Sequence, residues 1–118
     1  MPTIRILSDD VNYGRLNATK RRKIARQMRE EGSTVLLEDP NGVEALWLPP
    51  FELASAINTL PYAVDVEFSK ITAPDTRDEL AKVILRALFE CSDIESGTFC
   101  GVWIKTPYGF FWYMEVKP

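Results

Sequence analysis

The chain contains no histidine, only two cysteines and no long apolar run. Histidine is the commonest general base and the commonest zinc ligand, so its absence excludes the Ser-His and Cys-His nucleophile arrangements. Two cysteines without histidine also fall short of the four ligands of a structural zinc site. No apolar segment approaches the roughly 20 residues that span a bilayer. The sequence therefore predicts no metal ligands, no catalytic residues and no membrane segment.

Signals for export and for phosphate binding are missing as well. The start "MPTIRILSDD" lacks the basic and apolar regions of a secretory signal, so we expect a cytoplasmic protein. In that compartment Cys91 and Cys100 are expected to stay as buried thiols rather than form a disulfide. The six glycines are not clustered, which excludes a glycine-rich phosphate loop. We expect no cofactor.

What is present is typical of a folded protein of ordinary composition. The 118 residues are 46% apolar and 26% charged, which suits one domain over residues 1–118 with a single core. Charge is uneven: the first 29 residues hold eight basic and two acidic side chains, and the remainder holds six basic and fifteen acidic ones. This distribution predicts a positive end on a negative body.

The first half of the chain predicts a strand, a helix and a hairpin. Alternation in "TIRIL" predicts a strand over residues 3–8. Asn17 suits the N-cap of a helix over 18–31, with Gly32 just beyond its end. The segment "DPNG", between two apolar runs, predicts a β-hairpin over 33–48 that turns at Asn41 and Gly42.

The second half predicts a short helix, a strand, a long helix and a hairpin. Prolines bracket a short helix over 51–60. Residues 62–69 alternate as a strand with one apolar and one acidic face. Apolar spacing and the Thr76 and Glu79 capping box predict a helix over 72–91. "TPYG" predicts the turn of a last hairpin over 98–117.

The order of these elements favours an α+β fold. It reads strand-helix-strand-strand-helix-strand-helix-strand-strand, which predicts two layers: a largely antiparallel sheet of about six strands with helices packed on one face. The first six elements have the order of a ferredoxin-like split βαβ unit, to which a helix and a hairpin are added. This is an analogy of order, and order alone does not fix function.

Carboxylate pairs are the groups that could carry acid-base chemistry in this chain. The pairs are Asp9-Asp10, Glu38-Asp39, Asp65-Glu67 and Asp93-Glu95. Asp65 and Glu67 are the best candidates, because strand alternation puts both on one face about 7 Å apart. We favour the simpler interpretation, in which they keep a sheet face soluble and blunt strand pairing.

The helix over 18–31 carries a basic stripe. Arg22, Arg26 and Arg29 lie at helical spacing on one face, opposite the apolar stripe and without a neutralising acid. Basic residues fill the first turn and Glu30 and Glu31 the last, which opposes the helix dipole. The stripe is either a solvated face, a contact for an acidic protein surface, or a phosphate contact.

The last hairpin is aromatic on both faces. One face is predicted to face the core and the other to face outward. The predicted core face holds Cys100, Val102, Ile104, Phe110, Trp112, Met114 and Val116. The predicted outward face holds Phe99, Trp103, Lys105, Phe111, Tyr113, Glu115 and Lys117. Something must cover the outward aromatics: the chain itself, a second copy, a partner protein or stacked bases.

These observations lead to three hypotheses about function. The first is a non-enzymatic protein-binding module, an inhibitor or adaptor that is plausibly homodimeric and binds another protein or a second copy of itself. Its contacts would be Arg22, Arg26, Arg29, Phe99, Trp103, Phe111 and Tyr113. The second is a small nucleic-acid-binding domain that uses the basic helix. The third is a carboxylate-based enzyme or small-ligand protein in which Asp65, Glu67 or Asp9 converge in a pocket.

Overall fold

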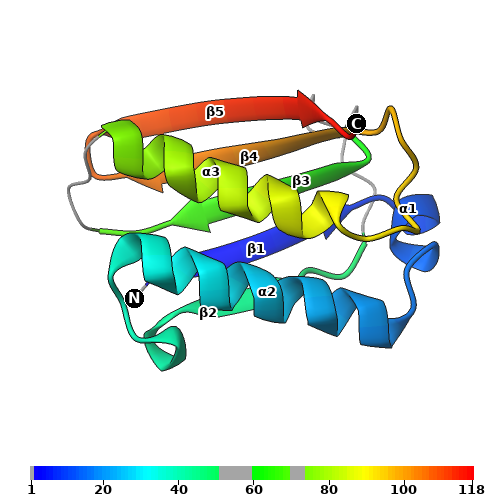
Figure 1. The fold of residues 1–118 in the computed structure, drawn as a ribbon, viewed down its shortest axis with the longest axis horizontal. Coiled ribbons are helices and arrows are strands. Elements are labelled where there is room, and N and C mark those ends of the chain that lie inside the picture. The colour runs from blue at the N-terminus through cyan, green and yellow to red at the C-terminus, as the bar shows by residue number, and fades with distance from the viewer. Residues whose placement is uncertain (1, 51–59, 70–73) are drawn as a thin grey trace.

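A computed structural model describes residues 2–50, 60–69 and 74–118 (Figure 1). One mixed sheet contains β1 (Thr3–Ser8), β2 (Glu44–Trp47), β3 (Tyr62–Glu67), β4 (Phe99–Thr106) and β5 (Gly109–Val116). Its strand order is β2-β1-β3-β4-β5. The β1–β2 and β3–β4 pairs are parallel, whereas β1–β3 and β4–β5 are antiparallel. The α+β class is confirmed, but the predictions of about six strands and of a largely antiparallel sheet were wrong.

Two βαβ units build most of this sheet. In the first, α2 (Ala18–Leu36) connects β1 to β2, and in the second, α3 (Pro74–Phe89) connects β3 to β4. Each helix crosses between two strands that are immediate neighbours. A split βαβ unit would place another strand between each pair. The ferredoxin-like analogy is therefore wrong, because the predicted hairpin over 33–48 concealed the parallel β1–β2 pair.

Both long helices pack on one face of the sheet (Figure 1). β1 and β3 turn Ile4, Ile6, Val64 and Val66 toward the helices, and all four side chains are buried. Helix α3 is the more apolar of the two. It buries Leu80, Ala81, Val83, Ile84, Leu85, Ala87 and Leu88. The core therefore lies between the helix layer and one sheet face, and none of the described helices covers the opposite face, which we call the open face.

Helix α2 begins where predicted and ends later. The Asn17 side chain accepts a hydrogen bond from the Lys20 N–H at 2.8 Å, which confirms the N-cap. The helix continues through Gly32 to Leu36, and Leu37 closes it with a left-handed φ of 55°. Gly32 is buried, and a Cβ there would come within 3.5 Å of Ile4 and 3.6 Å of Leu80. These are ordinary van der Waals distances, so Gly32 is a buried interior position of the helix rather than its end.

The predicted hairpin over 33–48 does not form. Residues 33–36 belong to α2, and "PNG" forms the short 3₁₀ turn η1 (Pro40–Gly42). The Asp39 side chain caps that turn by accepting the Asn41 N–H at 2.8 Å. Because η1 precedes β2 rather than joining two adjacent strands, β2 can run parallel to β1. The sequence correctly predicted a turn at these residues, but it predicted a hairpin turn where the structure has a 3₁₀ turn.

The structure agrees better with the predicted strand over 62–69 and with the predicted hairpin over 98–117. β3 buries Tyr62, Val64, Val66 and Phe68, as the alternation predicts. β4 and β5 form the predicted hairpin, with Pro107 and Tyr108 in the turn. The short helix predicted over 51–60 falls almost wholly outside the described residues. Among the described helices, none is long and apolar enough to cross a membrane.

The faces of β5 are the reverse of the prediction. Ile104 pairs with Phe111 and Val102 with Tyr113, so these two aromatic residues lie on the helix side and pack against the core. The aromatic side chains predicted for the core lie on the open face instead. They are Phe110 and Trp112, together with Met114 and Val116. The two-residue turn fixes this register, and aromatic residues on both faces left it ambiguous in the sequence.

Candidate functional site

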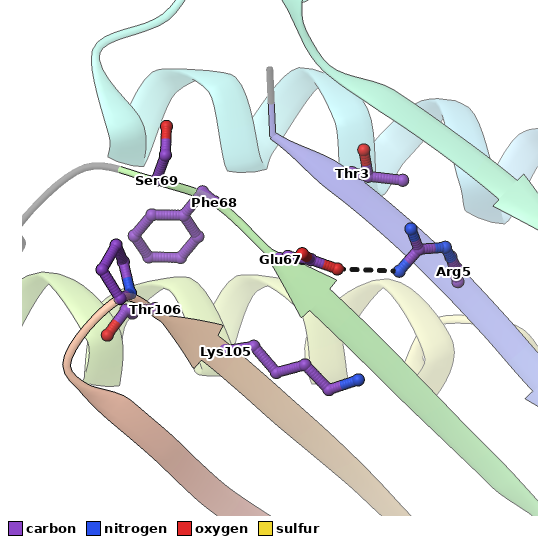
Figure 2. Close-up of a pocket in the computed structure, with 8 residues that line it drawn as sticks. Thr3, Arg5, Glu67, Phe68, Ser69, Lys105 and Thr106 are labelled. Carbon is purple, nitrogen blue, oxygen red and sulfur yellow. Dashed lines mark hydrogen bonds and ion pairs between the residues drawn. The ribbon is translucent and has the colours of Figure 1, made fainter.

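A pocket of about 370 Å³ lies at one end of the sheet, beside the start of β1 and the ends of β3 and β4 (Figure 2). We call it the rim pocket. Its lining consists of Thr3, Arg5, Glu67, Phe68, Ser69, Lys105, Thr106 and Pro107. The carboxyl ends of parallel strands are common ligand sites in open α/β sheets. Here the parallel β3–β4 pair ends at the pocket.

Four charged side chains run across three strands next to this pocket. Arg5 Nη1 lies 3.3 Å from Asp65 Oδ2 and 3.4 Å from Glu67 Oε2. Lys105 Nζ lies 3.4 Å from the same Asp65 oxygen. Figure 2 shows Arg5, Glu67 and Lys105 on the pocket side of their strands. The two cations therefore share Asp65, and Arg5 also contacts Glu67.

The two acids differ in their surroundings. The Asp65 side chain is 18% exposed and lies between both cations, whereas Glu67 is 58% exposed and contacts Arg5 alone. Asp65 Oδ1 is buried and has no hydrogen-bond partner within the described part of the chain. Asp65 is therefore fixed in place by the sheet, and Glu67 is free to move toward solvent.

The third functional hypothesis required Asp65, Glu67 or Asp9 to converge. Glu67 lines the rim pocket, and Asp65 accepts hydrogen bonds from two residues of the pocket lining, Arg5 and Lys105. Asp9 instead caps α1 (Asp10–Gly14), where its side chain accepts the Asn12 N–H at 2.7 Å. The sheet thus brings together two of the three acids.

An aromatic cleft adjoins the rim pocket on the open face. It has a volume of about 160 Å³ and shares Lys105 with the pocket. Trp103 and Trp112 meet edge to face with ring centroids 5.7 Å apart. Gly101 makes this possible, because a Cβ there would come within 2.5 Å of the Trp112 ring. The open face therefore combines a charged half with an aromatic half.

The opposite end of the sheet is closed by aromatic side chains. Trp47 meets both Tyr13 and Tyr62 edge to face, at centroid distances of 6.1 Å and 6.3 Å. Its ring N–H donates to the Arg21 carbonyl, and the Tyr62 hydroxyl donates to the Asn12 carbonyl. Arg21 also covers the Tyr13 ring. The Trp47 and Tyr62 polar atoms are therefore paired, whereas the nearby Ser8 Oγ is buried without a hydrogen-bond partner among the described residues. The packed rings favour a structural role for this end.

The predicted basic stripe is on the outer side of α2, away from the rim pocket. Arg22 and Arg26 are exposed, whereas Arg29 is half-buried. Within residues 2–50, 60–69 and 74–118, no carboxylate lies in ion-pair distance of these three arginines. The Nε atom of Arg29 is buried without a hydrogen-bond partner among the same residues. The arginines are not brought together with the aromatic residues predicted to act beside them.

The four predicted aromatic contacts divide between two faces. Trp103 and Phe99 lie on the open face, and Phe99 is 47% exposed. Phe111 and Tyr113 lie on the helix side, where Arg77 covers the Phe111 ring and the Tyr113 hydroxyl donates to Asp78 at 2.7 Å. Their prediction as outward-facing residues was wrong, because the register of β5 is shifted by one residue from the expected one.

The two cysteines are free thiols in different surroundings. Cys100 is fully buried, and burial raises the pKa of its thiol to about 12. Cys91 is half-buried beside a smaller cleft of about 210 Å³ between α2 and α3. The prediction of two buried thiols holds for Cys100, whereas Cys91 is only half-buried.

Sequence comparisons identify no relatives of this chain. No protein-family model matches it, and no curated protein matches it. Fold comparison does find solved structures of similar topology, and those described below have low sequence identity to this chain.

Three of these structures illustrate the shared fold. One is a protein inactivated by 2-oxo-3-pentynoate, with 16% identity, a TM-score of 0.62, and coverage of 89% of this chain and 83% of its own. Another is a fused 4-oxalocrotonate tautomerase solved as an asymmetric trimer, with 10% identity, a TM-score of 0.61, and coverage of 88% and 85%. A third is a malonate semialdehyde decarboxylase inhibited by 3-bromopropiolate, with 13% identity, a TM-score of 0.52, and coverage of 90% and 80%.

The fold is therefore tautomerase-like, with a five-stranded mixed sheet. The hypothesis of a non-enzymatic protein-binding module, an inhibitor or adaptor, is contradicted by these neighbours, which include enzymes. The hypothesis rested on the missing catalytic constellation, the uneven charge and the aromatic hairpin, and none of these features excludes the fold of an enzyme. The nucleic-acid hypothesis is untested and stays a prediction.

Sequence reasoning missed most of the rim pocket. Arg5 was counted only as part of the basic first segment, and Lys105 only as part of the hairpin. No local pattern links them, because 100 positions of the numbering separate residue 5 from residue 105. The one available signal was the alternation that put Asp65 and Glu67 on one strand face. Their cationic partners are supplied by the neighbouring strands.

Proposed function

We propose that this protein is an enzyme that transfers a proton within a small carboxylate, such as the keto–enol tautomerisation of a 2-oxo acid. The observation that carries the proposal is the convergence of Arg5 and Lys105 at a pocket beside the start of β1. A guanidinium and an ammonium suit the carboxylate of a small acid and the negative charge that develops on an enolate oxygen.

We propose further that Pro2 is the first residue of the mature protein and that its free amino group is the base. A general base works best with a pKa near the working pH. The chain has no histidine, and burial has raised the pKa of the Cys100 thiol to about 12. An α-amino group has an ordinary pKa of about 8, which makes it the best-matched group in a histidine-free chain.

The position of Pro2 supports this role. Pro2 is buried, and its carbonyl accepts the Glu44 N–H at 3.0 Å, which fixes the start of β1. The next residue, Thr3, lines the rim pocket. In the proposed step the Pro2 nitrogen takes a proton from the carbon next to the carbonyl. Its electron pair forms the enolate, and the proton then returns to another atom of the same molecule.

The compounds named with the structural neighbours support the substrate class. Both 2-oxo-3-pentynoate and 3-bromopropiolate are small carboxylates with a triple bond. Carboxylates of that size suit a pocket of about 370 Å³ that carries two cations.

Hydrogen exchange tests the proposal without knowledge of the natural substrate. We expect the mature protein to speed deuterium incorporation at C3 of 2-oxobutanoate in heavy water, measured by proton NMR. Pro2→Ala replaces the secondary amine of proline with a primary amine at the same position and should slow exchange about tenfold or more. Arg5→Gln should slow it through weaker binding, as a higher KM. Exchange no faster than that of the buffer alone would refute the proposal.

Mass spectrometry tests the identity of the base. The intact mass of the purified protein should lack Met1. With 2-oxo-3-pentynoate, the Pro2 nitrogen should add across the triple bond and its proton should pass to carbon, giving a one-to-one adduct with no leaving group. Peptide mapping should place the adduct on Pro2. Retention of Met1, or an adduct at another residue, would exclude Pro2 as the base.

We further propose that a second copy of the chain covers the aromatic half of the open face. Five large apolar side chains on this face are at least 44% exposed, and together they form an association surface. They are Phe99, Phe110, Trp112, Met114 and Val116. This keeps the predicted partner, a second copy, and the predicted contacts Phe99 and Trp103, but replaces Phe111 and Tyr113.

Light scattering coupled to size exclusion tests this association. Phe110 is 67% exposed and makes an edge-to-face contact with Trp103, so Phe110→Glu should leave the fold intact and reduce the measured mass to that of one chain. Tyr108→Glu, at a 71% exposed turn residue, is the matched control and should leave the mass unchanged. A wild-type protein of monomeric mass at micromolar concentration would refute the proposal.

A further inference from the structure

We propose that Glu67 is a specificity-determining residue of the rim pocket: in the unliganded protein its carboxylate occupies the place on Arg5 that a ligand carboxylate takes. This inference rests on the proposed function, because it concerns the same Arg5. It goes further in stating that the pocket carries its own competitor. Ligands bind only when they hold Arg5 better than Glu67 does.

The geometry of the Arg5–Glu67 contact allows a ligand carboxylate to replace Glu67. One guanidinium nitrogen, Nη1, serves both acids, at 3.3 Å from Asp65 and 3.4 Å from Glu67. Strong Arg–carboxylate pairs use two parallel N–H···O bonds of about 2.8 Å. The Arg5 side chain is 34% exposed, so a ligand that displaces Glu67 can reach the guanidinium and bind it with both carboxylate oxygens.

Asp65 and Glu67 lie on the same face of β3 but cannot exchange roles. Asp65 is held by both Arg5 and Lys105 and is only 18% exposed, so removing it would leave two cations without a common partner. Glu67 pairs with one cation among the described residues, Arg5, and is 58% exposed. An exposed ion pair of this kind contributes little to stability. Asp65 therefore positions the cations, and Glu67 yields to the ligand.

The charges of the pocket define which ligands succeed. With Glu67 in place, Arg5, Lys105, Asp65 and Glu67 are formally balanced. When Glu67 turns away, one positive charge is left unmatched, which suits a ligand with a single carboxylate. A carboxylate that offers both oxygens to Arg5 gains more than Glu67 loses. A halide or an alcohol does not have that geometry.

Carboxylate binding to variants tests the inference. The probe is 2-oxobutanoate, followed by the fluorescence of the tryptophans near Lys105 and by calorimetry. We expect Glu67→Gln to bind it about two- to fivefold more tightly, the gain from removing an exposed ion-pair competitor. Glu95→Gln is the matched control: it breaks the Arg15–Glu95 pair, also at 3.4 Å, in the loop before β4. It should leave the Kd unchanged.

Each outcome separates this inference from the proposed function. If Arg5→Gln weakens binding but Glu67→Gln leaves the Kd at the wild-type value, Glu67 is not a competitor and the anion site stands. If Arg5→Gln binds as well as wild type, the anion site and the inference both fail. If wild type does not bind detectably, binding by Glu67→Gln supports the competitor, and its absence overturns it. Circular dichroism of every variant checks that the fold is retained.

Discussion

The unit β1-α2-β2 and the unit β3-α3-β4 share one topology but present different chemistry. The pairing registers relate the two units by an approximate twofold axis, so that Ile4 corresponds to Val64 and Ile6 to Val66. The same axis relates β2 to β4. Both units therefore put equivalent residues into the core. They differ at the sheet ends, where one is an open pocket and the other is filled by aromatic rings.

The difference is sharpest at Arg5 and Asp65. The registers make these residues equivalent in the two units, and they are also direct partners across the β1–β3 pair. Lys105 lies at the end of β4, where the first unit has Leu48 just beyond β2. Both cations thus lie at the same end of the sheet. A repeated topology provides two equivalent ends, and side-chain chemistry decides which one can bind an anion.

Exchanging Arg5 and Asp65 should have the largest effect on the difference between the two units. The double variant Arg5→Asp plus Asp65→Arg keeps an arginine–aspartate pair between β1 and β3 but places the guanidinium in the second unit. We expect binding of 2-oxobutanoate to weaken about a hundredfold, since an acid replaces the cation at the pocket. Calorimetry measures this loss.

The control for this prediction is the stability of the double variant in urea. The single variant Arg5→Asp leaves three acids together and should be less stable in urea than the double variant. Wild-type affinity in the double variant would show that the position of the guanidinium does not matter, contrary to the expected asymmetry of the two ends.

Gly101 and Glu44 occupy equivalent positions, but only Gly101 is covered by a neighbouring strand. Gly101→Val should therefore lower the free energy of unfolding by about 2 kcal/mol, because its side chain meets the Trp112 ring. Glu44→Val, on the exposed edge strand, should change it by less than about 0.5 kcal/mol. Urea denaturation measures both. Equal effects in the two variants would contradict the packing described at Gly101.

The closed end depends on Tyr62, which starts β3 where Pro2 precedes β1. Tyr62→Phe leaves the Asn12 carbonyl without its donor and should cost about 1.5 kcal/mol in urea denaturation. Tyr108→Phe, at an exposed turn residue, is the control and should not measurably change the free energy of unfolding. Unchanged stability in Tyr62→Phe would show that this hydrogen bond does not hold the end closed.

Alkaline pH provides a second test of the same residue. Burial raises the pKa of Tyr62 to about 12, whereas an unfolded tyrosine loses its proton near pH 10. Between these values the unfolded state binds fewer protons than the folded state, so the free energy of unfolding falls as the pH rises. Tyr62→Phe should reduce that fall between pH 10 and 12, measured by urea denaturation at each pH. An identical pH profile would refute the assignment.

The smallest expected effect concerns the start of α2, where basic residues oppose the helix dipole. Asn17→Ala removes the hydrogen bond to the Lys20 N–H and should cost about 1 kcal/mol. Asn17→Asp keeps the acceptor and adds a favourable negative charge, so it should match or exceed wild type. Thermal denaturation followed by circular dichroism compares them. An Ala variant as stable as the Asp variant would contradict the capping role.

Local signals predicted the elements they act on directly. Alternation identified β1 and the buried face of β3, the Asn17 side chain located the start of α2, and the turn residues located the last hairpin. Each of these depends on contacts between residues a few positions apart. They are the reason that the α+β class could be read from the sequence.

Signals with two meanings were resolved by packing. Gly32 resembles a helix stop, but here it is a buried residue inside α2 that packs near Ile4 and Leu80. The residues "PNG" favour a turn, but they form η1 and lead into a parallel strand. The run "GFFWYMEV" has apolar residues on both faces, so its register could not be chosen by hydrophobicity.

The sequence by itself determined the class of fold, the absence of histidine and the acidic pair on β3. Only the tertiary structure placed Arg5 and Lys105 beside that pair, closed one end of the sheet and left the other open. The physical reason is that strand pairing joins residues far apart in the chain. No local propensity encodes which strands become neighbours, so a site shared by β1, β3 and β4 exists only once the sheet has formed.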